Sequence, residues 1–395
     1  AGVPAVPVNT IPHDSHRLHA SLLVLLALFA TLVLLPSFGT IDMNIWSFWG
    51  ENPWRHGLVE GYALNAHEHP PGLTAMLWTG YCIADWLGVQ PYLGIKLTFL
   101  PFLFASSAVV WHWSRNLFVT LFCHGVLAYS AMALSYIDIF FAPFVLLAFY
   151  LLQRERPVMA MAAFSLACLM KYPPLMILPF VVLFLLARYR RPGDHCAAPL
   201  RTLLRVLLVP LLLLAITLLV FGMEPLLALQ RAFRHSILSA QALNLNWIIA
   251  RLLLVDGAVP MDTHGDYGAW LVGDWQIPVW VKILSRTLYG SFYLAALLLF
   301  AVRAKTLENL LLSALLGHFA YFMFTIGAHE NHLYLSCLLA MCLYCIRASW
   351  LPLLVLVCAI SSGNLFLFYG VDGYPVKLFG SSMVQVTGIV AYEEG

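Results

Sequence analysis

The stretch LHASLLVLLALFATLVLLPSFGTID, residues 18–42, joins a long apolar segment to an acidic residue. Its segment Leu18–Ser37 is long and apolar enough to cross a bilayer as a helix, and we expect it to be a retained span. Asp42 follows only a few residues later, so we expect its carboxylate at the membrane–water boundary. Ionisable groups at that depth are costly and are functional candidates by default.

The composition indicates a membrane protein. Of the 395 residues, 62% are hydrophobic and only 10% are charged, whereas a soluble domain carries roughly 25% charged residues. No basic stripe is present, so we do not expect nucleic-acid binding. The eight cysteines are scattered and have neither zinc spacing nor the pattern of a disulfide framework. We therefore predict an all-α polytopic membrane protein.

Apolar segments of about 20 residues, or somewhat fewer where helices are short, predict about eleven transmembrane helices. They are Leu18–Ser37, Ile95–Trp113, Leu117–Leu134, Ile139–Leu152, Val158–Met170, Leu175–Ala187, Leu203–Phe221, Val279–Val302, Leu307–Ile326, His332–Ile346 and Trp350–Phe368. Lys and Arg gather on cytoplasmic loops, and their placement fits one orientation only if Gly72–Leu87 does not cross. We expect that segment to be an interfacial or re-entrant helix on the outer side.

One membrane domain, residues 1–370, is the simplest organisation, because no repeat or flexible linker divides the chain. Residues 39–94 form its first outer loop, residues 222–278 a long outer loop, and residues 371–395 an outward C-terminal tail. The outward connections bring polar groups that a plain helix bundle does not need. Besides Asp42, the candidate site residues are His67, Glu68, His69, Asp138, Lys171, Arg231, Arg234, Asn246, Trp247, His329, Glu330 and His332.

Several of these polar segments also have a structural interpretation, although His329-Glu330, which interrupts apolar sequence between two spans, is harder to explain in this way. Asp42 would be a helix-end carboxylate in water, and Asp138 would cap a helix. Lys171 would extend its ammonium to the interface along an apolar stem. Pro70-Pro71 would simply start the next helix. The acidic run of residues 256–274 is a solvated loop in this interpretation.

Metal binding is not expected. The segments His67-Glu68-His69 and His329-Glu330-Asn331-His332 superficially resemble zinc motifs. A zinc helix, however, needs two histidines four apart on one face, and these are two and three apart. Histidines, lysine and arginines that face one cavity suit an anionic leaving group such as a phosphate.

The order of these motifs resembles the GT-C glycosyltransferases. An acidic residue after the first span precedes His67-Glu68-His69-Pro70-Pro71-Gly72-Leu73-Thr74, and Lys171-Tyr172-Pro173-Pro174 follows the middle helices. Asn244-Leu245-Asn246-Trp247 and Ala328-His329-Glu330-Asn331-His332 complete the likeness. It is strongest to the branch with the dolichyl-phosphate-glucose-dependent glucosyltransferases of the endoplasmic reticulum and bacterial relatives of the GPI-anchor mannosyltransferases.

The resemblance implies a GT-C-like bundle and transfer of a hexose, with inversion, from a polyprenyl-phosphate or dolichyl-phosphate donor. Asp42 would be the general base, and basic residues would stabilise the departing phosphate. The aromatic residues Trp46, Trp49 and Trp54 would shape the sugar pocket. Three positions depart from the pattern: Asn44 replaces a second acid found in some branches, which favours metal-independent chemistry. His69 stands where an aromatic residue is usual, and Asn331 where a basic residue is usual.

The partners implied are a polyprenyl-phosphate-linked sugar, membrane lipids, and a lipid-linked glycan, polymer or protein acceptor. We expect the bacterial inner membrane, with the site facing the periplasm or exterior; the endoplasmic reticulum membrane is the alternative. A transporter or flippase for a lipid-linked or anionic solute is the alternative function, although its inverted repeats are not evident. A metal-dependent membrane hydrolase would need a metal set that the sequence does not offer.

Overall fold

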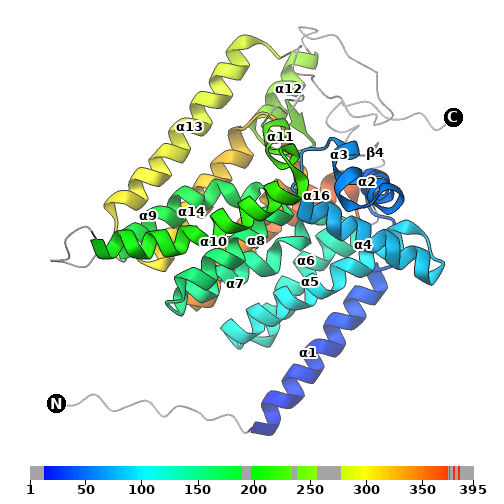
Figure 1. The fold of residues 1–395 in the computed structure, drawn as a ribbon, viewed down its shortest axis with the longest axis horizontal. Coiled ribbons are helices and arrows are strands. Elements are labelled where there is room, and N and C mark those ends of the chain that lie inside the picture. The colour runs from blue at the N-terminus through cyan, green and yellow to red at the C-terminus, as the bar shows by residue number, and fades with distance from the viewer. Residues whose placement is uncertain are drawn as a thin grey trace.

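A computed structural model describes residues 13–188, 197–233, 238–255, 277–371, 373, 377–378 and 381–382 of the chain. Over these residues the fold is almost entirely helical (Figure 1). Its α-helices are α1 (His13–Leu34), α2 (Asp42–His56), α3 (Leu58–Asn65), α4 (Pro71–Leu87), α5 (Pro91–Ser114), α6 (Leu117–Ala128), α7 (Ala142–Gln153), α8 (Pro157–Met170), α9 (Leu178–Arg188), α10 (Ala197–Phe221), α11 (Glu224–Ala232), α12 (Leu245–Val255), α13 (Val279–Val302), α14 (Leu307–Phe324), α15 (Tyr334–Ile346) and α16 (Leu351–Tyr369).

Short turns and strands connect these helices. The helical turns are η1 (Tyr129–Ala133), η2 (Ile137–Phe140), η3 (Pro173–Ile177), η5 (Glu330–Leu333) and η6 (Ala348–Trp350). Strand β1 (Ser239–Ala240) pairs in parallel with β2 (Ala328–His329), which joins the long outer loop to the connection before α15. In the tail, β3 (Lys377–Leu378) pairs with β4 (Ser381–Ser382) in antiparallel fashion.

Four helical segments in the described residues are long and apolar enough to cross a membrane: Pro91–Ser114, Val279–Val302, Leu307–Phe324 and Ala348–Tyr369. A fifth is obtained if α10 and α11, which meet at a bend of 108°, count as one broken span. The predicted helical fold is therefore confirmed, whereas only four to five of the about eleven predicted transmembrane helices are long and apolar enough in these residues to count as candidate spans. The segment predicted not to cross, Gly72–Leu87, corresponds to α4, which is not among these spans.

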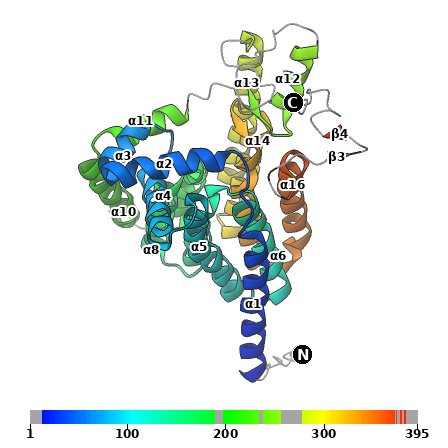
Figure 2. The ribbon, with the colours of Figure 1, turned by 90° about the vertical axis from the view of Figure 1, so that its right-hand side faces the viewer.

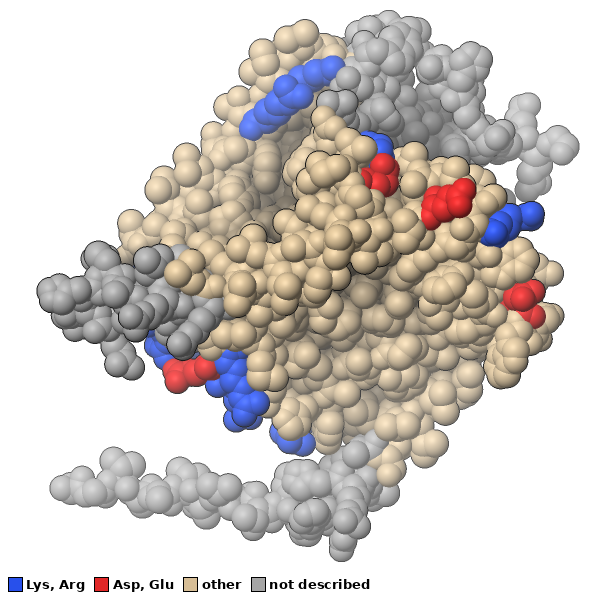
Figure 3. All heavy atoms as spheres, viewed as in Figure 1, with Lys and Arg blue, Asp and Glu red and all other residues tan. Residues whose placement is uncertain are grey.

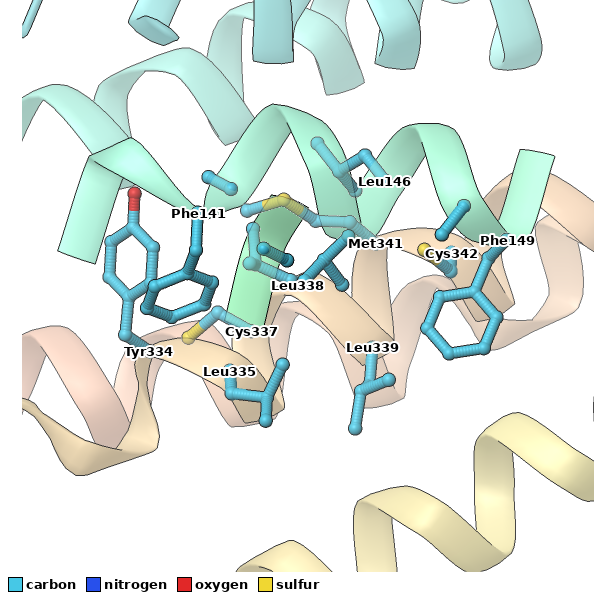
Figure 4. Close-up of a cluster of buried hydrophobic side chains, with 14 of the residues drawn as sticks. Phe141, Leu146, Phe149, Tyr334, Leu335, Cys337, Leu338, Leu339, Met341 and Cys342 are labelled. Atoms are coloured by element: carbon cyan, nitrogen blue, oxygen red, sulfur yellow. The ribbon is translucent and has the colours of Figure 1, made fainter. Parts of the chain in front are cut away.

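Apolar packing between α7 and α15 forms the centre of the bundle (Figure 4). Phe141, at the start of α7, stacks edge-on against Tyr334 with ring centroids 5.7 Å apart. Further along the pair, Phe149 and Leu339 are fully buried. This core fixes η2 and η5 relative to each other, because η2 leads directly into α7 and η5 directly into α15.

The first outer loop is itself helical and lies at one end of the bundle. In Figure 2, α2 runs roughly at right angles to α1 and leads across to α3 and α11. The buried residues of α2 recur at helical spacing (Met43, Trp46, Gly50 and Pro53), so one face packs inward. Helix α4 then packs closely along α5, where Gly94 lies directly against the α4 backbone at Gly80.

Charged side chains gather at two ends of the visible face, with a broad uncharged belt between them (Figure 3). One of these ends carries α2, α3 and α11. Large apolar side chains are exposed along α13, including Val279 at 72% and Ile283 at 60%. Exposed apolar surface on this scale marks an interaction site in a soluble protein, and along a candidate span it suits contact with lipid tails.

Candidate functional site

Asp42 is the first residue of α2 and is partly exposed. A helix N-terminus favours a carboxylate and by itself would lower the pKa of Asp42. The surroundings act in the other direction. Burial raises the pKa of Asp42 to about 6; the positive charge of Lys171 opposes this rise, and the negative charge of Asp138 adds to it. Asp42 is therefore more than a helix-end carboxylate in water, because it titrates close to neutrality.

Asp138 and Lys171 form a buried ion pair beside Asp42. The Lys171 ammonium donates to both carboxylate oxygens of Asp138 at 2.9 Å, and the side chains are 8% and 2% exposed, respectively. Asn331 Nδ2 donates to Asp138 Oδ2 at 2.8 Å. Lys171 thus does not reach the interface, and Asp138 bonds side chains from two other segments instead of capping η2.

Glu330 is the third carboxyl group and lies on η5, in the connection ahead of α15. It is buried, accepts a hydrogen bond from the Tyr136 hydroxyl, and its backbone carbonyl accepts one from Asn364 Nδ2 at 3.0 Å. Burial and then the negative charge of Asp42 raise the pKa of Glu330 to about 7. The two carboxyl groups therefore interact electrostatically, although 288 positions separate them in the sequence.

We call Asp42, Asp138, Lys171 and Glu330 the carboxylate cluster. Its members come from the start of α2, from η2, from the residue after α8 and from η5. Near pH 7 Glu330 is partly protonated. The other members of the cluster are two further carboxyl groups, those of Asp42 and Asp138, and the ammonium group of Lys171. Since Lys171 is already paired with Asp138, its charge is directed to that carboxylate and not to an incoming phosphate. The chemistry that this arrangement supports best is proton transfer at Asp42.

A second group, the aromatic cluster, consists of Trp46, Trp49, His67 and His69. Asp42, Trp46 and Trp49 share one face of α2, being four and seven residues apart. The ring of Trp49 lies 4.5 Å from that of His67 and 5.4 Å from that of His69. As predicted, the two histidines are not helical, because they fall between α3 and α4. Pro71, as its structural interpretation held, begins α4.

His67 is held in a neutral state within this cluster. Its Nε2 lies 2.9 Å from Thr74 Oγ1, and its Nδ1 accepts from the backbone N–H of His69 at 3.2 Å. Burial, opposed by backbone hydrogen bonds and assisted by the nearby charge of Arg231, lowers the pKa of His67 to about 4. His67 therefore carries no charge for a phosphate at neutral pH. Glu68 is partly exposed beside it.

Arg231 connects α11 to the first outer loop. Its Nε donates to the backbone carbonyl of His67 at 3.0 Å, and its guanidinium pairs with Glu224 at the other end of α11. Tyr172, after Lys171, donates to the carbonyl of Pro225 at 2.9 Å. These contacts fasten α11 over the aromatic cluster. Arg234 lies outside the described residues.

The remaining predicted residues have structural partners. Asn246 is fully buried; its Nδ2 donates to the Phe324 carbonyl at 3.0 Å, and its Oδ1 accepts from Ser285 at 2.6 Å. The ring of Trp247 lies 6.3 Å from that of Phe368. His332 Nδ1 accepts from the backbone N–H of His329 at 3.1 Å, and the two rings are 5.1 Å apart. These contacts favour helix packing for Asn246 and a local turn for the two histidines.

Several residues that complete the site were not predicted as members of it. Tyr136 and Tyr369 both surround Glu330, and Tyr369 also bonds Gln241 on the long outer loop. Asn331 was noted in the sequence only as a departure from the family pattern, yet its side chain donates a hydrogen bond to Asp138. Tyr136 could have been predicted as a site residue from its position two residues before Asp138 in an outward connection. Nothing in the local sequence distinguishes Tyr369 from the other residues of its predicted span.

Within the ranges that the structure describes, no three His, Cys, Asp or Glu side chains are grouped to hold a metal ion. Comparison of the sequence with known protein families and with curated proteins found no match.

Proposed function

We propose that the chain is an integral membrane glycosyltransferase that moves a hexose from a polyprenyl-phosphate or dolichyl-phosphate donor to an acceptor hydroxyl. The observation that carries this proposal is the carboxylate cluster: four segments of the chain meet so that Asp42 is poised to exchange a proton near neutral pH. A general base works best when its pKa is close to the operating pH. The motif order that resembles the GT-C enzymes supplies the reaction class.

In the proposed reaction Asp42 accepts the proton of the acceptor hydroxyl while the hydroxyl oxygen attacks the anomeric carbon. The bond between that carbon and the phosphate oxygen breaks, and the polyprenyl phosphate leaves with the electron pair. Because the leaving group is a stable anion, it needs charge stabilisation and no proton. Because Lys171 is paired with Asp138, other basic groups would have to stabilise the phosphate. His329, His332 and Arg234 are the predicted candidates for this role.

The proposed fold is a GT-C-like bundle of about eleven transmembrane helices. Six shorter apolar helices accompany the candidate spans in the described part of the chain: Ser21–Leu34, Leu117–Ala133, Ile137–Gln153, Pro157–Met170, Pro173–Arg188 and Glu330–Ile346. Together with the four long spans and the bent pair, they would supply the eleven segments. In that arrangement α2, α3 and α11 lie at the non-cytoplasmic interface, and the membrane is the bacterial inner membrane or that of the endoplasmic reticulum.

The test is sugar transfer by the purified protein in detergent or nanodiscs. Labelled polyprenyl-phosphate-glucose, -mannose and -galactose are supplied with membrane lipid extracts as acceptor source, and the transferred label is followed by lipid extraction. We expect one donor to turn over, and Asp42→Asn to lower the rate by about 10²-fold or more with donor binding retained.

Glu60→Gln is the matched control, since Glu60 lies in the same loop, is exposed on α3 and is outside the carboxylate cluster; we expect its rate to stay close to that of the unaltered protein. Glu68→Gln tests the competing acid, which lies closer to the site. An inactive Glu68→Gln together with a fully active Asp42→Asn would show that the base is misassigned. No turnover with any of the three donors would count against the transferase itself.

One feature favours the alternative, a transporter or flippase. The 108° bend between α10 and α11 resembles the broken helices on which many transporters build their sites. The bend lies at the end of the bundle that carries the polar groups, and not in the middle of the apolar belt, which is why we place transfer first. If the protein moved a labelled lipid-linked sugar across the membrane of proteoliposomes, and Asp42→Asn moved it equally well, the transporter or flippase would become the preferred function.

A further inference from the structure

Lys96 is a fully buried lysine in α5 that the proposed reaction does not use. Its ammonium donates to four backbone carbonyls: that of Met132 at 2.6 Å, those of Leu35 and Leu34 at 3.4 and 3.5 Å, and that of Ser37. Among the described residues, no carboxylate forms an ion pair with it. A buried cation that lacks a counter-ion is costly, so its retention needs a reason.

The carbonyls around Lys96 belong to two separate stretches of backbone. Leu34 ends α1 and leads into the connection of residues 35–41, whereas Met132 lies in the η1 turn. Carbonyls at helix ends carry partial negative charge and have lost their intrahelical partners, so they favour a cation. The one ammonium therefore satisfies the ends of both elements at once.

Further hydrogen bonds fasten the same two stretches together. The N–H of Thr40 donates to the carbonyl of Leu134 at 3.1 Å, and Ser135 Oγ donates to the carbonyl of Phe38 at 2.9 Å. Gly39 has a φ of +86°, and a side chain there would run into Ser135 and the backbone of Leu134. The backbones thus approach more closely than two ordinary loops would.

These two stretches lead to two of the three acids of the carboxylate cluster, Asp42 and Asp138. The connection of residues 35–41 ends at Asp42, and the stretch after η1 leads through Tyr136 to Asp138. We infer that Lys96 is a positioning residue: its ammonium ties the backbone before Asp42 to the backbone before Asp138, and so fixes the two carboxylates relative to each other. The effect of Lys96 on catalysis rests on the proposed function, whereas its effect on the relative positions of the two carboxylates does not.

The test separates these two parts. Dicyclohexylcarbodiimide, an apolar reagent that modifies protonated carboxyl groups, is applied to the purified protein between pH 5 and 8, and Asp42 labelling is quantified by mass spectrometry. In Lys96→Met we expect Asp42 to become more solvated. A fall of one unit in its pKa, from about 6, would cut the labelled fraction at pH 6 about fivefold. The rate of sugar transfer should fall by a similar factor or more, with the Michaelis constant for donor little changed.

Lys305→Met is the matched control. Lys305 also donates only to carbonyls, those of Phe300, Ala301 and Arg303 at 2.7–2.8 Å, but it does so at the far end of α13. We expect its Asp42 labelling and transfer rate to match the unaltered protein. A milder variant, Ser135→Ala, removes one bond of the same connection and should give a smaller shift in the same direction.

The outcomes are distinct. Labelling and rate in folded Lys96→Met that equal those of Lys305→Met would overturn the inference while leaving the proposed function intact. Labelling that shifts as expected, with no sugar transfer even by the unaltered protein, would sustain the positioning role and reject the proposed function. If Lys96→Met does not fold, Ser135→Ala decides, and unchanged Asp42 labelling in that variant would overturn the inference.

Discussion

The carboxylate cluster and the aromatic cluster share one face of α2, yet they differ in how their charges are handled. In the first, Asp42, Glu330 and the pair of Asp138 with Lys171 influence one another through their charges, and two of their pKa values lie near neutrality. In the second, burial holds His67 neutral among rings. Polar residues of one loop therefore have two different roles: some are placed to exchange protons, and others pack among aromatic rings and shape the site.

The largest effect should come from the ion pair that holds the carboxylate cluster together. Removing one partner of a buried pair leaves the other charge uncompensated and costs about 3–5 kcal/mol. We therefore expect Lys171→Met to lower the free energy of unfolding by that amount, since Asp138 would stay buried. Thermal or denaturant unfolding in detergent, followed by tryptophan fluorescence, measures it.

An exposed ion pair in the same chain provides the control. Arg188 pairs with Glu155, and their side chains are 54% and 69% exposed. Pairs of this kind contribute about 0–1 kcal/mol, so Arg188→Met should leave stability nearly unchanged. Equal losses in the two variants would contradict the distinction between a buried structural pair and a surface pair.

The next effect concerns pH. Because burial raises the pKa of Asp42 to about 6, this carboxyl is protonated and inactive as a base below that value. The rate of sugar transfer should rise with pH, reach half its plateau near pH 6, and be about tenfold lower at pH 5. An unperturbed aspartate would instead give a flat profile from pH 5 upward.

Glu330→Gln sharpens the assignment. Glu330 is still largely protonated while Asp42 titrates, since its own pKa is higher, at about 7. Replacing it by a neutral amide should therefore leave the midpoint near pH 6, and the amide oxygen can still accept from Tyr136. A midpoint that disappears in Glu330→Gln would assign the titration to Glu330.

How far the sequence leads can be judged from particular residues. The apolar segments predicted the helices, and the place of Asp42 after the first span predicted its unusual environment. The pairing of Lys171 with Asp138 was not predictable, because 33 residues separate them and each had a plausible role alone. Lys96 was missed although a lysine inside an apolar segment is a recognised signal. Its carbonyl partners come from backbone geometry, which no local pattern specifies.

A smaller effect is expected in the aromatic cluster. His67→Leu removes the contact with Thr74 and leaves that buried hydroxyl without its partner, at a cost of about 1–3 kcal/mol. Because His67 is neutral and lies outside the carboxylate cluster, the rate should fall by less than about tenfold and its pH midpoint should stay near 6. Thr74→Val tests the same contact from the other side. A shifted midpoint in His67→Leu would show that the two clusters are coupled in proton transfer.

The smallest expected effect is that of chelation. The charges of Asp42 and Asp138 act on each other, and two carboxylates of this kind would attract a divalent cation if both were open. Here the ammonium of Lys171 occupies both oxygens of Asp138, so the positive charge that such a site needs is already supplied by the chain. We therefore expect the rate of sugar transfer to be unchanged after treatment with EDTA. A rate that collapses with EDTA and returns with Mg²⁺ or Mn²⁺ would mean that Lys171 yields its place in the working enzyme. Asp42 would then be a metal ligand, and the raised pKa that distinguishes the carboxylate cluster would not describe its active form.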